Sequence, residues 1–445
     1  MSDAPLLEVN DLVKYFDEGN SPLDRLLNIE TPPVQAVDGV SFEINQGETF
    51  GVVGESGCGK STVGQTILGL LNPTAGETHF KGDNIYQMGS DETRRFRRNS
   101  QIVFQDPFSS LNPRMTIGAV LQEPLNIHNV GSKADRRKKA EQMIERVGLS
   151  ADHLGRYAHE FSGGQLQRVC IARALVLEPD FIVLDEPVSA LDVSVQAQVL
   201  NLLNDLQQDF GLTYLFIAHD LGVVQYLCDR IAVMYLGQIA EIGPTDRIFE
   251  HPAHPYTQAL LESIPRATLE EQHRQITGVS GDVPSPRDPP IGCRFHTRCP
   301  KVIQPEGMDL NQENWRSIIT IWNRLENDSE SLEEFSRTED DSLNRERLVN
   351  DFTTAFGLPE PGQITDEQAS VAVAEGVDAI VEGEFDRAAA VFDSTFTTVC
   401  RAHEPEPVDA GPESHRSACF LTYDDPPSVS EVDRTGQAAS ASSDD

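Results

Sequence analysis

The fold is decided by residues 49–71, which read TFGVVGESGCGKSTVGQTILGLL. The stretch begins as a short apolar strand, passes through a glycine-rich loop from Gly54 to Ser61 and continues as a helix. The loop GESGCGKS matches the phosphate-loop pattern in full, and it lies between a strand and a helix as that pattern requires. The sequence therefore predicts a phosphate-binding loop in an α/β fold, with an ordinary glycine-rich turn as the alternative.

The residues of this loop have roles that follow from their chemistry. Glycines let backbone N–H groups surround a phosphate, and the following helix points its positive end at the same anion. We expect Lys60 to reach the β- and γ-phosphates and the Ser61 hydroxyl to ligate Mg²⁺. Cys58 occupies a variable position and receives no chemistry of its own. The predicted nucleotide-binding residues of this stretch are Gly54, Glu55, Ser56, Gly57, Cys58, Gly59, Lys60, Ser61 and Thr62.

Strand and helix patterns alternate on both sides of the loop. Residues 6–53 contain short strand-like runs, residues 107–176 contain longer helical patterns, and residues 213–220 and 230–243 return to strands. A helix is expected over 193–211, with Gly211 as its stop. The alternation predicts βαβ units and a mostly parallel sheet.

A pair of carboxylates marks a second position in that sheet. The run FIVLDEP at 181–187 is continuously apolar until Asp185 and Glu186, as in a buried parallel strand. Asp185, at the carboxyl end of the strand, can hold Mg²⁺ through water beside a phosphate loop. Glu186 is then placed to polarise an attacking water as a general base. The alternative is an acidic pair at a strand end that serves solubility alone.

A third anion site is predicted at the helix that starts after Phe161. The sequence FSGGQ places a Ser and two glycines at a helix N-terminus, where exposed N–H groups favour an anion. One molecule has little use for two γ-phosphate sites, whereas two molecules arranged head to tail can each close one site over the other's nucleotide. The residues of this predicted signature are Phe161, Ser162, Gly163, Gly164 and Gln165.

With these motifs in order, the sequence resembles the ATPase subunits of ABC transporters. Besides the phosphate loop, the carboxylate pair and the signature, it matches three further motifs: Gln105 in FQDP, the D-loop Ser189-Ala190-Leu191-Asp192, and His219 in IAHD. The signature begins with Phe where Leu is commoner. The resemblance implies a P-loop NTPase core with an antiparallel β subdomain near the N-terminus and an α-helical subdomain at about 107–178.

The resemblance also implies roles for residues outside the phosphate loop. Gln105 would sense the γ-phosphate and Mg²⁺, and His219 would hold the γ-phosphate and the attacking water. Asp192 would couple the two sites across the dimer. An aromatic near the N-terminus should stack on adenine; Phe16 fits that place best, with Tyr15 as the neighbouring candidate. The expected catalytic residues are Glu186, His219 and Lys60, and the expected Mg²⁺ ligands are Ser61, Gln105 and Asp185.

The sequence beyond Pro244 resembles the C-terminal extension of oligopeptide, dipeptide and nickel importer ATPases. The resemblance rests on HPAHPYTQALLESIP at 251–265 and VPSPRDPPIGCRFHTRCP at 283–300. In that subfamily a Cys pair is followed closely by two more Cys, and some members carry a [4Fe–4S] cluster on the set. Here about 100 residues separate the second and third, which places an acidic insertion between them. The candidate cluster ligands are Cys293, Cys299, Cys400 and Cys419, with zinc or unligated thiols as alternatives.

Five segments are therefore expected. We call residues 1–245 the body, residues 246–300 together with about 400–423 the extension, and residues 301–399 the insertion. The insertion should be moderately helical but, like the rest of the C-terminal third, too polar to share much of an apolar core. Residues 424–445 are expected to be a disordered tail.

The charge of the chain restricts its partners. The formal net charge is −36, and only seven of the 35 basic residues are Lys. An acidic chain is a poor candidate for nucleic acid, because phosphate neutralisation needs Lys and Arg. The acidity is interpreted as haloarchaeal in type, suited to a salt-rich cytoplasm, with partial disorder as the alternative. Since no run approaches the ~18 apolar residues of a membrane span, we expect the chain at the cytoplasmic face of the membrane, held there by partners.

The function implied by the resemblance is ATP hydrolysis that powers import of oligopeptides or dipeptides. Its expected partners are a second ATPase subunit, in a homo- or heterodimer, two transmembrane permease subunits and an extracellular substrate-binding protein. The alternatives are import of nickel or another small solute and, more distantly, a soluble ABC ATPase outside transport.

Overall fold

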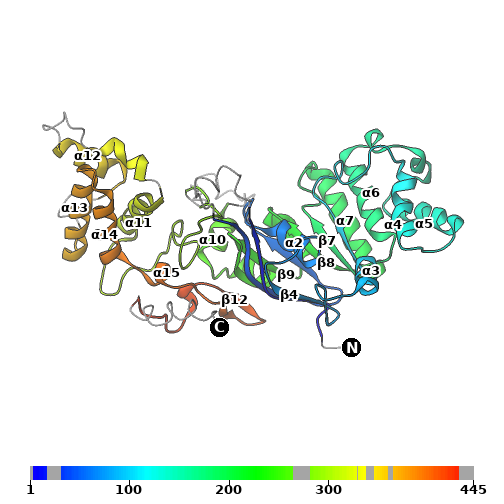
Figure 1. Cartoon of the computed structure of the whole chain (residues 1–445), viewed down its shortest axis with the longest axis horizontal. Coiled ribbons are helices and arrows are strands. Elements are labelled where there is room, and N and C mark those ends of the chain that lie inside the picture. The colour runs from blue at the N-terminus through cyan, green and yellow to red at the C-terminus, as the bar shows by residue number, and fades with distance from the viewer. Residues whose placement is uncertain are drawn as a thin grey trace, which may run out of the picture.

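The computed structural model of this chain describes residues 4–17, 32–263, 281–327, 329–336, 345–358 and 364–429. These residues form an elongated molecule. Helices α4–α6 of the body lie at one end, α11–α14 of the insertion lie at the other, and the sheets lie between them (Figure 1). Most of the predicted tail lies outside the described residues.

Five neighbouring parallel strands make up most of the larger sheet. Four of them are almost fully buried, because continuous runs of apolar residues can be covered on both faces. The fifth, at the edge of the sheet, is partly buried. The eight-stranded sheet has the order β11-β12-β10-β9-β3-β8-β7-β6. Its parallel members are β9 (Arg230–Tyr235), β3 (Thr49–Val53), β8 (Thr213–Ala218), β7 (Phe181–Asp185) and β6 (Ser100–Val103).

A second, antiparallel sheet covers the N-terminal part of the body. It has four strands in the order β2-β1-β4-β5: β2 (Val34–Ile44), β1 (Leu7–Phe16), β4 (Ala75–Phe80) and β5 (Asp83–Asn84). Its apolar face packs with part of the parallel sheet in one core that includes Phe42, Phe50 and Phe181. The predicted α/β class with an antiparallel subdomain is confirmed.

The helices of the body begin and end where local sequence dictates. The long helix α7 (Val193–Phe210) starts at Asp192, whose side chain accepts the N–H of Val195, and ends at Gly211 in the left-handed region at φ 64°. The others are α2 (Lys60–Ile67), α3 (Ser90–Asn99), α4 (Ile117–Ile127), α5 (Lys133–Arg146), α6 (Gly163–Leu175), α8 (Leu221–Leu227) and α9 (Thr245–Glu250), with 3₁₀ turns η1 (Ala151–Gly155) and η2 (Ala158–Glu160).

The extension is built into the larger sheet. Its returning part, near residue 415, forms β12 (His415–Ser417), which pairs antiparallel with β10 (Gln238–Pro244) and with β11 (Val408–Gly411). At this edge the buried His415 Nε2 lies 2.7 Å from Glu241 Oε1. The remaining elements are α10 (Pro255–Glu262), α15 (Val399–Ala402) and η5 (Phe420–Thr422). These two added strands were not predicted from the sequence.

The insertion is a helical unit with a core of its own. It contains α11 (Gln312–Asn327), η4 (Ser329–Phe335), α12 (Arg345–Ala355), α13 (Glu367–Val381) and α14 (Phe385–Phe396). Trp315, Trp322, Phe352, Phe392 and Phe396 are buried among aliphatic side chains. The expectation of a region too polar for a core is therefore wrong, because its apolar residues are gathered on the inner faces of amphipathic helices.

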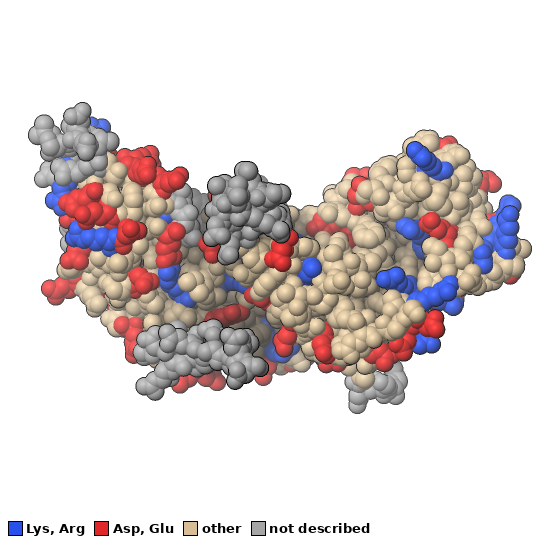
Figure 2. All heavy atoms as spheres, in the orientation of Figure 1, with Lys and Arg blue, Asp and Glu red and all other residues tan. Residues whose placement is uncertain are grey.

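Acidic and basic residues are distributed differently over the surface. On the face in Figure 2, Asp and Glu are spread over most of the molecule, while Lys and Arg gather mainly at the end that carries α4 and α5. None of the helices in the described ranges is both long and apolar enough to cross a lipid bilayer.

Candidate active site

The phosphate loop joins β3 to α2 and has the open backbone that anion binding needs. Gly54 and Gly59 have φ of 155° and 107°. A Cβ at Gly54 would collide with the backbone oxygen of Met234, and one at Gly59 with that of Ala36, so neither position accepts a side chain. No side chain caps α2, so the loop leaves the N–H groups of the first turn available to a phosphate.

Lys60 lies inside this loop. Its side chain is 4% exposed, and Nζ donates to the carbonyl oxygens of Gly54 at 2.8 Å and Glu55 at 2.9 Å. Cys58 is buried beneath the loop, and burial raises the pKa of its thiol, so it packs rather than reacts. The amine is thus positioned at the centre of the loop before any phosphate arrives.

Ser61 and Asp185 meet beside the loop, although 124 residues separate them in the chain. The Ser61 hydroxyl donates to Asp185 Oδ1 at 2.8 Å. Burial raises the pKa of Asp185, while the Ser61 hydrogen bond opposes the rise. Two oxygen ligands at the end of a parallel strand suit Mg²⁺, a hard cation that prefers oxygen, so these residues fit that ion.

Two predicted residues converge on the carboxylate of a third. Gln105 Nε2 donates to Glu186 Oε2 at 2.9 Å, and His219 Nδ1 lies 3.1 Å from the same oxygen. Glu186 follows β7, His219 follows β8 and Gln105 follows β6, so the carboxyl ends of three neighbouring parallel strands bring them together. The arrangement can hold a water between the carboxylate, the imidazole and the amide.

The backbone at Glu186 is itself unusual. Its φ is 44°, in the left-handed region that a Glu rarely adopts, and its N–H donates to Ile217 O at 3.0 Å. Such conformations cost free energy and persist where the surrounding structure imposes them, often at functional sites. Here the bend turns the Glu186 side chain out of the strand toward Gln105 and His219.

The two aromatic candidates for adenine differ in their surroundings. Tyr15 donates its hydroxyl to Asp38 at 2.5 Å, and its pKa is raised to about 12 by burial and this hydrogen bond. Phe16, at the end of β1, is partly exposed, and Lys14 Nζ lies 5.0 Å from its ring centroid. The hydroxyl of Tyr15 is thus already engaged by Asp38, whereas the ring of Phe16 is left partly exposed at the end of the strand.

The signature lies at the start of α6, away from the described contacts of the phosphate loop. Ser162 caps this helix: its Oγ accepts the N–H of Gln165, and its own N–H donates to Gln165 Oε1 at 3.1 Å. Gly164 allows close approach of Val195 at the start of α7, which follows Asp192 of the D-loop. Signature and D-loop are therefore neighbours, and both Ser162 and Asp192 are exposed.

The four candidate cluster cysteines come together from distant parts of the extension. The N–H of Cys293 donates to Cys400 O at 2.8 Å, and Cys299 packs against the cores of both the body and the insertion. Burial raises the pKa of Cys293, and the neighbouring Cys400, Cys299 and Cys419 raise it further. Within the described ranges, however, no three His, Cys, Asp or Glu side chains are placed to hold a metal ion. The described arrangement of these thiols therefore gives no support to the predicted iron–sulfur cluster.

The extension also reaches the phosphate loop, which the sequence did not predict. Arg298 forms two hydrogen bonds to the Glu55 carboxylate, and the Tyr256 hydroxyl accepts the N–H of Glu55 at 3.0 Å. Arg298 and Glu55 are 243 positions apart. The Arg-Cys pair in the extension motif is visible in the sequence, but nothing local connects it with a loop so distant in the chain.

Three family descriptions match successive parts of this chain. The one for ABC transporters matches residues 37–189, and the one for the C-terminal region of oligopeptide/dipeptide transporters matches residues 240–305. A domain of unknown function, DUF8228, matches residues 312–413. The first two cover the phosphate loop, the carboxylate pair and the first two cysteines, and the third covers the helices of the insertion.

Curated relatives extend the similarity over both of the first two regions. A putative peptide import ATP-binding protein of Brucella ovis is 53% identical over 304 residues, which are 68% of this chain and 92% of the relative. The oligopeptide transport ATP-binding protein AppF of Bacillus subtilis is 51% identical over 66% of this chain and 89% of its own length. The dipeptide transport ATP-binding protein DppF of Escherichia coli is 48% identical, over 68% and 88%.

Proposed function

This chain belongs to the ATP-binding proteins of ABC transporters, in the group that serves peptide import, and we propose from that premise how its residues bind and hydrolyse ATP to power an importer. The observation that carries the proposal is the convergence of Gln105 and His219 on Glu186 beside the Ser61–Asp185 pair. These contacts join the phosphate loop to the ends of three strands.

ATP binding is assigned to the phosphate loop and the end of β1. Lys60 turns its ammonium from the carbonyls of Gly54 and Glu55 to the β- and γ-phosphates, while the N–H groups of the loop surround the β-phosphate. Phe16 stacks on the adenine. Ser61 and Asp185, with Gln105 nearby, hold Mg²⁺, which when bound neutralises charge on the phosphate oxygens.

Hydrolysis is assigned to Glu186 together with Gln105 and His219. Glu186 accepts a proton from the water that attacks the γ-phosphate, since general-base catalysis needs a carboxylate within hydrogen-bond reach of that water. His219 and Gln105 fix the position of this carboxylate through its Oε2. The positive φ at Glu186 sets the direction in which this side chain leaves the backbone.

The signature supplies the reason for a dimer. Ser162, Gly163 and Gly164 contact the γ-phosphate bound by a second ATPase subunit, whose own signature closes over the nucleotide of this chain, and Asp192 lies beside the contact. Whether the second subunit is a copy of this chain or a different one, both sites then close only with ATP in place.

Two membrane permease subunits would take up the motion of this dimer. A groove of about 210 Å³ lies beside Gln105, lined in part by Phe104, Ile127 and Arg173. Ile127 is 62% exposed, which is unusual for so large an apolar side chain unless a partner covers it. The groove would seat a permease segment at the cytoplasmic face, and an extracellular binding protein would deliver the peptide.

The acidic surface fits a haloarchaeal type of cytoplasm. At about 1 M salt the Debye length is only about 3 Å, so the many carboxylates in Figure 2 hardly repel ATP. Short-range contacts such as those of Lys60 then decide nucleotide affinity. No iron–sulfur cluster is assigned to the four cysteines, because the described residues bring no three ligand side chains together around a metal position.

A deletion strain tests the function. It is grown on defined short peptides as the sole source of a required amino acid, and in parallel under nickel limitation. Restoration of peptide-dependent growth by the wild-type gene but not by Glu186→Gln supports the proposal. The matched control is Glu178→Gln, which changes an exposed carboxylate that forms an ion pair with Lys139. Normal peptide use with failure only under nickel limitation would replace peptides by nickel as the substrate.

A further inference from the structure

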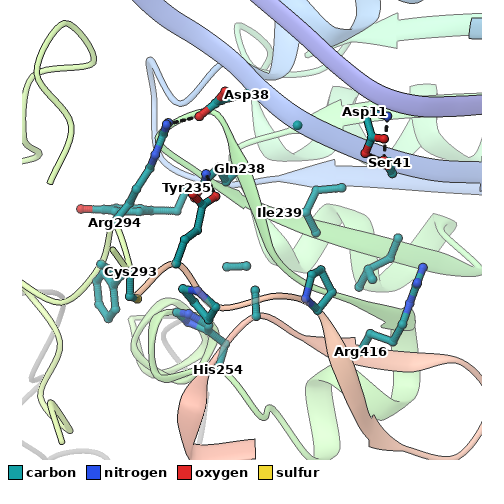
Figure 3. A pocket seen from close by; sticks show the side chains of 18 residues that line it. Asp11, Asp38, Ser41, Tyr235, Gln238, Ile239, His254, Cys293, Arg294 and Arg416 are labelled. Atoms are coloured by element: carbon teal, nitrogen blue, oxygen red, sulfur yellow. Dashed lines mark hydrogen bonds and ion pairs between the residues drawn. The ribbon is translucent and has the colours of Figure 1, made fainter. Parts of the chain in front are cut away.

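Two arginines of the extension reach opposite sides of the nucleotide site. Both lie in the seven-residue segment Cys293–Cys299, which we call the arginine segment. Arg294 pairs with Asp38 and donates to Gln35 Oε1 at 2.9 Å and to Leu236 O. Figure 3 shows Arg294 extending to Asp38 in the wall of a pocket that Cys293 and His254 also line. Since Asp38 also accepts the hydroxyl of Tyr15, Arg294 is tied to the strand that carries the adenine platform.

Arg298 holds the other side, the phosphate loop. Its two terminal nitrogens donate to Glu55 Oε2 at 2.7 Å and Oε1 at 3.0 Å, and it also contacts the Tyr235 hydroxyl at 3.2 Å. Arg298 is only 8% exposed. A two-pronged, charge-assisted pair in such a position fixes geometry as well as charge. The Glu55 backbone is held in addition by Tyr256 of α10.

Glu55 lies where an unpaired negative charge would oppose the ligand. It is the second residue of the phosphate loop, and its carbonyl accepts a hydrogen bond from Lys60 Nζ. A carboxylate at this position repels a triphosphate unless a cation is paired with it, because Coulomb interactions weaken only slowly with distance in a partly buried site. Arg298 is the cation that pairs with Glu55 among the described residues.

We propose that the arginine segment is a working part of the ATP site: Arg298 positions the phosphate loop and neutralises Glu55, while Arg294 holds the adenine side at a fixed distance from it. The extension then sets ATP affinity. Arg298 is a positioning residue, since it acts through Glu55. The proposal rests on the proposed function, because it assumes that the phosphate loop binds ATP.

The test compares Arg298→Gln, Glu55→Gln and the double variant in the full-length chain, by equilibrium binding of a fluorescent ATP analogue and by steady-state hydrolysis. We expect Arg298→Gln to raise the ATP dissociation constant and KM about tenfold with kcat nearly unchanged, because it leaves Glu55 unpaired. The double variant has no charge at either position and should return to within about threefold of wild type. Arg416→Gln, an exposed arginine of the same extension, is the matched control and should not change affinity.

Glu55→Gln alone makes the test independent of folding defects at Arg298. It is nearly isosteric, and its amide oxygen still accepts a hydrogen bond from Arg298, so the loop keeps its position and ATP should bind at least as tightly as in wild type. The defect of Arg298→Gln should also shrink between about 0.1 M and 1 M salt, as the Debye length falls from about 10 Å to 3 Å. Melting temperatures accompany each variant.

Three results would overturn the proposal: unchanged affinity in Arg298→Gln, a double variant as weak as that single variant, or weakened binding in Glu55→Gln. Failure of the proposed function looks different, because wild type itself would then bind no ATP and Lys60→Ala would change nothing. Wild-type binding that Lys60→Ala abolishes separates the two cases.

Discussion

The body and the insertion are both packed around apolar cores, but they differ in what else they bury. The body and extension enclose charged side chains such as Lys60, Asp185, Arg294 and Arg298. Among the described residues of the insertion, the buried polar side chains comprise Thr398 alone. Since burying a polar group costs free energy unless it is paired, enclosed charges often gather where a molecule binds or reacts. The buried charges therefore place the chemistry in the body and extension. The insertion is an attached unit with an apolar core of its own.

The largest effect on ATP binding by the body is expected from Lys60→Ala. Removing the ammonium at the centre of the phosphate loop should lower ATP affinity by at least about 100-fold, which amounts to loss of measurable binding. Equilibrium binding of a fluorescent ATP analogue measures it. Lys81→Ala removes an exposed lysine paired with Asp180 and should bind normally. Normal affinity in Lys60→Ala would mean that the loop is not the nucleotide site.

Glu186→Gln separates binding from reaction. Turnover should fall about 10²–10⁴-fold, because the amide cannot accept the proton of the attacking water. ATP should still bind, and the closed dimer should accumulate in size-exclusion chromatography with ATP. Undiminished turnover would remove Glu186 as the base.

Phe392→Ala tests the independence of the insertion. The ring is buried against Phe396 and Gly376, so its loss should destabilise α13 and α14 by about 3–5 kcal/mol in hydrogen exchange. ATP affinity should stay within about twofold of wild type, because Phe392 belongs to the core of the insertion and not to that of the body. A large change in affinity would show that the insertion participates in the nucleotide site.

The smallest effect is expected from pH. Burial lowers the pKa of His254 to about 4, so the folded chain keeps it neutral while the unfolded chain protonates it below its ordinary value of 6.5. Its stabilising contribution is therefore present above pH 6.5 and is lost as the pH falls toward 4, by up to about 3 kcal/mol. His254→Asn keeps an acceptor for the N–H of Tyr256 and should flatten this dependence in pH-resolved unfolding.

The insertion gives the internal control for that measurement. Residues 301–399 contain no histidine, so the exchange protection of α13 and α14 should not follow the same titration. Identical pH profiles in wild type and His254→Asn would contradict the assignment of the effect to this side chain.

Sequence reasoning recovered the parts of the site that depend on local order. A loop that needs glycine at φ 107° and a strand that is apolar to its last residue leave direct marks in the sequence, and so do Lys60, Asp185 and Glu186. That Gln105 and His219 meet on one oxygen of Glu186 depends on the lateral order of β6, β7 and β8, which no single segment encodes.

The parts that escaped prediction are those made by distant partners. The contact between Arg298 and Glu55 joins two motifs that were each recognised but never connected. In α11, Trp315, Ile318, Ile319 and Trp322 follow helical spacing, so that buried face was visible, whereas its partners in α14 were not. The three residues of β12 look polar, and only pairing with β10 makes them a strand. The cysteine spacing suggested a cluster that the described arrangement does not support.

The backbone link between Cys293 and Cys400 has a consequence for the order of folding. The insertion leaves and rejoins the extension at neighbouring points. Its helices can therefore form from local contacts before the later part of the extension has made its own. Closing the long loop between Cys293 and Cys400 costs little more entropy than closing a shorter one. The contacts of the residues that follow this loop are nevertheless delayed. During synthesis the strands through β10 emerge first, and Glu241 meets His415 only 174 positions later. Strand β12 thus joins the sheet late, and it completes a domain whose catalytic half is already assembled.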